Sequence, residues 1–116
     1  MTEVTGDRTG QAIDVVTASV IQGALESIAV EMGHKLMRMS YSSIIRESED
    51  FGAALTDAEG RQIAETPQST PLQSGPIPGY VKGIKQIFEE RGHTFAPGDV
   101  IIHNSAYHGA SHGPDV

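Results

Sequence analysis

The 116-residue chain contains no cysteine and no tryptophan, and only 5% of its residues are aromatic. Without cysteine it can form no disulfide and offers no thiolate to a metal. Basic residues are also scarce: the chain has 8 Lys and Arg residues and 15 Asp and Glu residues, which gives a formal net charge of −7. Since nucleic-acid binding depends on clustered basic residues, we expect no nucleic-acid partner.

Long uninterrupted apolar runs are missing as well. No run approaches the roughly 18 to 20 residues that span a bilayer, and the N-terminus has no charged segment followed by an apolar one. We therefore expect a cytoplasmic protein with no membrane association. The 13 glycines and 6 prolines indicate that much of the second half is turn and loop.

The N-terminal half is predicted to contain one long helix and a β-hairpin. Residues 1–13 are polar and aperiodic, which is typical of a flexible lead-in, and residues 14–116 form the domain. Asp14 is the expected N-cap of a helix that runs to about residue 40. Two strand-like runs, 51–56 and 61–65, flank a turn that starts with Asp and ends with Gly. The helix prediction rests on apolar residues at helical spacing: Val16, Val20, Ile21, Ala24, Leu25, Ile28, Met32, Leu36 and Met39.

The C-terminal half is predicted to contain a second helix and a strand. After a proline-rich loop, apolar residues recur at helical spacing over 77–91, and Gly92 ends the helix. The apolar run 99–103 is typical of a buried strand that leads into a polar loop. The fold class is therefore α+β: a long N-terminal helix, a β-hairpin, a second helix and a strand leading to that loop.

The polar loop concentrates potential metal ligands. His103, His108 and His112 lie within ten residues, and Asp115 follows in a Gly-Pro turn. Imidazole and carboxylate suit several divalent metals, so Zn, Mn and Fe all remain candidates. The pair His112 and Asp115 is the sharper prediction, because a short turn can bring both side chains to one ion. The alternative is an ordinary surface loop rich in histidine.

Three stretches of this chain resemble the hydantoinase B/oxoprolinase family, which includes subunits of acetone and acetophenone carboxylases. They are Leu25–Met32, Tyr41–Gly60 and Pro97–Val116, the last containing His-Gly-Pro-Asp at 112–115. Family members usually have Asn-Asp-Pro-Tyr-x-Gly-Gly-Thr-His-x-Pro-Asp in this place. The present chain departs from that pattern at four positions: Ser105, Ala106, Ala110 and Ser111.

The resemblance implies that His112 and Asp115 are metal ligands in a subunit several times longer, with a further histidine ligand downstream. We therefore expect this chain to be a fragment, inactive alone. His108 occupies a variable position of the motif, so its catalytic role, in proton transfer, rests on its place in the loop. The Tyr107 hydroxyl is expected to orient a ligand or the substrate; alternatively, its ring holds the loop shut.

The implied activity is ATP-dependent hydrolysis of a cyclic amide by the B-type subunit of a hydantoinase or oxoprolinase. A hydantoinase A-type partner subunit is expected to use ATP, while the metal polarises the carbonyl of the small-molecule substrate. Two alternatives stay open: a subunit of an acetone- or acetophenone-type carboxylase, with a ketone substrate, and an inert truncated domain that only binds a partner subunit. The sequence leaves the choice between hydrolysis and carboxylation open.

Overall fold

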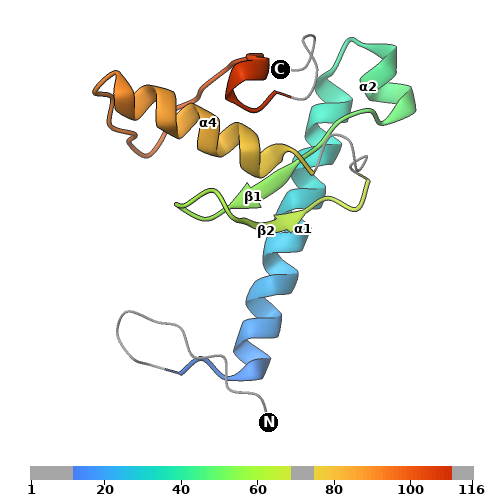
Figure 1. Ribbon diagram of the computed structural model, residues 1–116. Helices are drawn as coiled ribbons and strands as arrows, with labels where there is room; N and C mark the ends of the chain where they lie inside the picture. Colours follow the sequence, from blue (N-terminus) through green and yellow to red (C-terminus); the bar gives the residue numbers. More distant parts are fainter. Residues whose placement is uncertain (1–11, 69–74, 111–116) are drawn as a thin grey trace.

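The structure is a computed structural model that describes residues 12–68 and 75–110. Figure 1 shows a long helix, α1 (Val15–Met39), with a short helix α2 (Ser43–Ser48) beside its C-terminal end. A two-stranded hairpin, β1 (Ala54–Thr56) and β2 (Gln62–Glu65), lies against the middle of α1. Helix α4 (Ile77–Glu90) and a single 3-10 turn, η1 (Ala106–His108), complete the fold. This is the predicted α+β class.

Helix α1 begins and ends as the sequence predicts. Asp14 is the N-cap: its Oδ1 accepts the backbone N–H of Thr17 at 2.8 Å, and its Oδ2 accepts the Thr17 hydroxyl at 2.9 Å. At the other end, the backbone N–H of Ser40 donates to the Leu36 carbonyl. These bonds satisfy backbone groups that a helix end leaves without partners.

The cap makes the stability of α1 depend on pH. The backbone N–H of Thr17, and next its hydroxyl, hold the pKa of Asp14 below its ordinary value of 3.8. Because the folded-state pKa is the lower one, the stabilisation is complete above 3.8 and is lost as pH falls through the folded-state value. We expect Asp14→Ala to melt below the wild type at neutral pH, and the difference to shrink on acidification. Circular dichroism melts across pH check this, and a difference independent of pH would contradict it.

Helix α2 was not predicted. Residues 46–50 are mostly charged, residues 44–50 have no apolar periodicity, and the helix Ser43–Ser48 is only six residues long and mostly exposed. Its start is fixed by the Ser40 hydroxyl, which accepts the backbone N–H of Ser42 at 3.1 Å. Its end is fixed by Glu49, whose φ of 53° is left-handed. One turn held by its ends leaves no periodic signal in the sequence.

The predicted hairpin is confirmed. Its strands are antiparallel, with Leu55 opposite Ala64 and a register irregularity between Leu55 and Thr56. Asp57 closes the turn: its Oδ1 accepts the backbone N–H of Arg61 at 2.8 Å, and its Oδ2 accepts Arg61 Nε at 2.6 Å. The backbone N–H of Arg61 is the main reason that the pKa of Asp57 is lowered. Gly60 supplies the left-handed residue, with φ 79°.

The core is small and lies where α1 meets the hairpin. Ala29 and Gly33 are the buried residues of α1, one turn apart. A Cβ on Gly33 would lie 3.0 Å from Phe51 Cε2 and 3.3 Å from Thr66 Cγ2. Phe51 and Thr66 are themselves buried. Gly33 is therefore a packing position, because only a residue without a side chain fits against Phe51.

Two glycines of α1 should consequently respond oppositely to the same substitution. A Cβ on Gly23 would meet no atom within 4 Å, so Gly23→Ala should stabilise the protein by about 1 kcal/mol through helix propensity. Gly33→Ala gains the same propensity but presses on Phe51, and we expect a net loss of about 1 to 2 kcal/mol. Urea unfolding measures both, and equal stabilisation by the two changes would contradict the packing role of Gly33.

The hairpin turn positions α4. The ammonium group of Lys85 donates to the Ala58 carbonyl, and a Cβ on Gly60 would lie 3.3 Å from Val81 Cγ1. Helix α4 covers the predicted range, and Gly92, with φ 76°, follows its end as expected. The position of α4 relative to α1 thus depends on the hairpin between them.

The predicted buried strand at 99–103 is wrong. These residues form no strand, and Val100 and Ile102 are 87% and 78% exposed. They follow a turn in which Asp99 accepts the backbone N–H of Ala96 at 2.8 Å. An apolar run becomes a strand only beside another strand, and the described part of the chain places none there.

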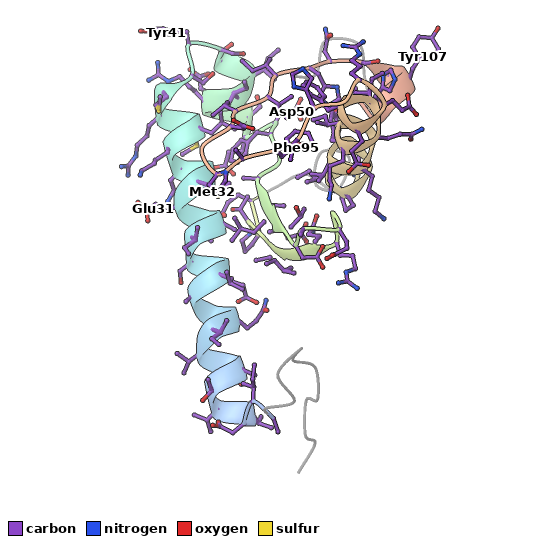
Figure 2. The ribbon with its side chains drawn as sticks, turned by 90° about the vertical axis from the view of Figure 1, so that its left-hand side faces the viewer. Glu31, Met32, Tyr41, Asp50, Phe95 and Tyr107 are labelled. Atoms are coloured by element: carbon purple, nitrogen blue, oxygen red, sulfur yellow. The ribbon has the colours of Figure 1, made fainter. Side chains whose placement is uncertain are left out.

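Helix α1 is mostly exposed. Both views show its N-terminal half extending beyond the hairpin and α4 (Figures 1 and 2). By length and mean hydropathy, α1 could cross a membrane. The sequence analysis did not predict this, because it counted only uninterrupted apolar residues. Mostly buried core helices of soluble proteins and N-terminal signal sequences meet the same criteria, and the observation concerns length and composition alone.

Candidate functional site

The first half of the predicted metal loop is described, and it rests on the backbone of α4. A Cβ on Gly83 would overlap the carbonyl oxygen of His108, and a Cβ on Gly109 would overlap the carbonyl oxygen of Gly79. Gly109 also has φ 104°, a left-handed value that favours glycine. The absence of side chains at 83 and 109 therefore lets η1 lie directly on the helix.

Ser105 organises this part of the loop. Its carbonyl accepts the backbone N–H of His108 at 3.0 Å and that of Ala110 at 3.1 Å. Its hydroxyl lies 2.8 Å from Nδ1 of His108. The imidazole of His108 is thus held through Nδ1, which leaves Nε2 as the nitrogen able to meet a substrate, a proton or a metal.

His103 is held at the entrance to the loop. Its Nδ1 accepts the backbone N–H of Ser105 at 3.3 Å, so a neutral ring carries its proton on Nε2. The ring of Tyr80 on α4 packs edge-on against it, with centroids 5.4 Å apart. Nε2 is buried and has no hydrogen-bond partner within the described ranges. A buried N–H without a partner is costly, so we expect a water molecule or another acceptor to bond this atom.

Tyr107 points into solvent. It is 98% exposed, and Figure 2 shows its side chain extending away from the rest of the fold. The alternative in which its ring holds the loop shut is therefore wrong. An exposed hydroxyl at this place can still contact a substrate, so its role in orienting one stays a prediction.

The predicted ligands His112 and Asp115 lie outside the described residues. Within 12–68 and 75–110, no group of three or more His, Asp or Glu side chains could hold a metal ion. The ligand assignment consequently stays a prediction. The described loop is compatible with it, because His108, four residues before His112 in the sequence, is already held by Ser105 and against α4.

Sequence reasoning missed the residues that hold the loop, which are Gly83, Gly109, Ser105 and Tyr80. One signal was present: Gly79 and Gly83 are four residues apart and so share one face of a helix. Such a pair permits close backbone approach, but the sequence does not say which segment approaches. The role of the Ser105 hydroxyl in holding the loop is visible only in the structure, where it lies next to the His108 ring.

Comparison with known proteins gives the family. Residues 14–116 match the family model described as hydantoinase B/oxoprolinase. The chain is 70% identical over 104 residues to a protein of Pseudomonas sp. (strain NS671) named as the putative B subunit of a D-/L-hydantoinase, covering 90% of this chain and 18% of that protein. It is 33% identical over 100 residues to the beta subunit of the caprolactamase of Pseudomonas jessenii, covering 86% and 16%.

A more distant relative is a 5-oxoprolinase of Saccharomyces cerevisiae, 31% identical over 104 residues, covering 90% of this chain and 8% of that protein. No solved structure matches the chain. The chain spans less than a fifth of the length of these curated relatives. Because the family model covers nearly all of it, the chain belongs to the hydantoinase B/oxoprolinase family.

Proposed function

We propose that this chain supplies the loop region of a B-type subunit that hydrolyses a cyclic amide, together with an ATP-using A-type subunit. The observation that carries the proposal is the 70% identity to a protein named as the B subunit of a hydantoinase. Relatives named hydantoinase, 5-oxoprolinase and caprolactamase all take their names from cyclic amides. The word "subunit" in two of these names supports a partner chain.

In this proposal, His112 and Asp115 hold a divalent metal, Zn, Mn or Fe, with further ligands from the rest of the subunit. The metal, when bound, polarises the amide carbonyl of the substrate. His108, fixed through Nδ1 by the Ser105 hydroxyl, presents Nε2 for proton transfer to or from the opening ring. Tyr107, whose exposed side chain is free to contact a substrate, orients that substrate through its hydroxyl.

The test uses a chimera in which this chain replaces the matching 104-residue segment of the Pseudomonas sp. subunit. The chimera is combined with an A-type subunit, ATP and, in turn, a hydantoin, 5-oxoproline and caprolactam. We expect ring-opened product and matching ADP release with at least one of them. Release of ADP with a ketone and bicarbonate instead would favour the carboxylase alternative. Binding of the A-type subunit without turnover, when the parent subunit is active, would favour the inert domain.

A further inference from the structure

Helix α1 carries an exposed row of apolar residues that the fold leaves uncovered. We call it the apolar ridge; its members recur every three or four residues, within about 80° of one another around the helix axis, and are Ile21, Ala24, Ile28 and Met32. All are exposed, and the three larger side chains range from 38% at Met32 to 48% at Ile21. The buried residues Ala29 and Gly33 lie on another side of the same helix. The hairpin therefore occupies one side of α1 and leaves the ridge free.

The geometry of the ridge suits another helix. Residues spaced by four form the ridges that fit into grooves of a second helix, most often at a crossing angle of about −50°. Ala24, within the ridge, is small enough to admit a close approach. An ion pair between Glu31 and Lys35, at 3.3 Å and largely exposed, provides polar residues on the same helix. Apolar residues in a row with charges nearby are typical of a docking surface.

The size of the relatives indicates what covers it. The matched 104 residues make up 18% of the Pseudomonas sp. subunit, so more than four fifths of that polypeptide lies outside the match. We infer that the apolar ridge of α1 is the docking surface for an amphipathic α-helix from this additional length of the B-type subunit. The inference rests on the family and on the exposure of α1, and it is independent of the metal and the substrate.

Two other occupants are less favourable. A second copy of the chain must lose translational and rotational freedom to bind, whereas a segment of the same polypeptide is present at a high effective concentration. A membrane would have to receive a chain with a formal net charge of −7, which anionic lipid surfaces repel. Both occupants nevertheless predict distinct results in the following experiment.

The absence of cysteine makes a clean accessibility test possible. Ile28→Cys places a thiol on the ridge, and Ser19→Cys places one at an exposed polar position of the same helix. Each is made in the 116-residue chain and in the chimera described above, and the rate of maleimide labelling at that peptide is measured by mass spectrometry. We expect both thiols to react fast in the chain. In the chimera, Ile28→Cys should react at least about 100-fold more slowly, because labelling then requires local opening, while Ser19→Cys keeps its rate.

Several results would overturn the inference. Equal labelling of Ile28→Cys in the chain and the chimera would show that the additional length does not cover the ridge. Equal protection of Ser19→Cys in the chimera would mean that the whole helix is enclosed, without a ridge-specific contact. Protection of Ile28→Cys already in the isolated chain, with a dimer by light scattering, would indicate a second copy. Protection only upon adding phosphatidylcholine vesicles would indicate a lipid surface.

Discussion

In the chimeric subunit, His112→Ala and Asp115→Ala should each remove bound metal and cyclic-amide turnover together. If about three protein side chains hold the ion, losing one leaves too few anchors. Even changes to residues that only support a ligand cost about 10- to 100-fold in metal affinity or activity, so loss of a ligand should cost more than that. For each variant, the number of metal ions bound per subunit is measured by elemental mass spectrometry and compared with the turnover rate.

His108→Ala is the internal comparison. The Ser105 hydroxyl at 2.8 Å already engages its Nδ1, and we assign its Nε2 to proton transfer. Metal content should therefore stay near that of the wild type while turnover falls. Tyr107→Phe should be milder than either ligand change, because the exposed ring holds no part of the loop. Full metal content in His112→Ala would refute the ligand assignment. Metal loss in His108→Ala would favour a local site built from His108, His112 and Asp115.

The elements that the sequence predicted are those specified by local chemistry. The Asp14 cap defines the start of α1, the Asp57 turn defines the hairpin, and Gly92 follows the end of α4. Each depends on hydrogen bonds or backbone angles within a few residues, which residue type and spacing report directly. The family resemblance, carried by residues in the same local stretches, was confirmed by the comparisons.

What the sequence failed to predict depends on contacts between distant segments. The run at 99–103 has the composition of a strand, but Val100 and Ile102 stay exposed because no strand lies beside them in the described part of the chain. Gly33 lowers the helix propensity of α1, and only the placement of Phe51 against it shows its packing role. In the same way, apolar periodicity identified α1 as amphipathic but could not tell which rows of the helix the hairpin would cover.

The docking of the loop on α4 gives the second large prediction. Gly83→Ala would drive a methyl group into the His108 carbonyl oxygen, and neither the helix backbone nor the loop backbone can yield as a flexible side chain would. The loop should therefore shift away from α4. Since a displacement of about 1 Å can cost about 100-fold in rate, we expect turnover of the chimera to fall by roughly that factor. Overpacking should also lower stability by about 1 to 3 kcal/mol.

Gly79→Ala is the matched control, since it places the same methyl group one turn earlier on the same helix, where nothing lies within 4 Å. It should keep turnover within about twofold and gain up to about 1 kcal/mol of stability from helix propensity. Hydrogen exchange of the backbone amides of His108 and Ala110, which donate to the Ser105 carbonyl, gives a second readout. Exchange at both amides should accelerate in Gly83→Ala and stay unchanged in Gly79→Ala. If the two variants match in turnover and exchange, the loop does not depend on its contact with α4, and the catalytic role assigned to His108 loses its structural support.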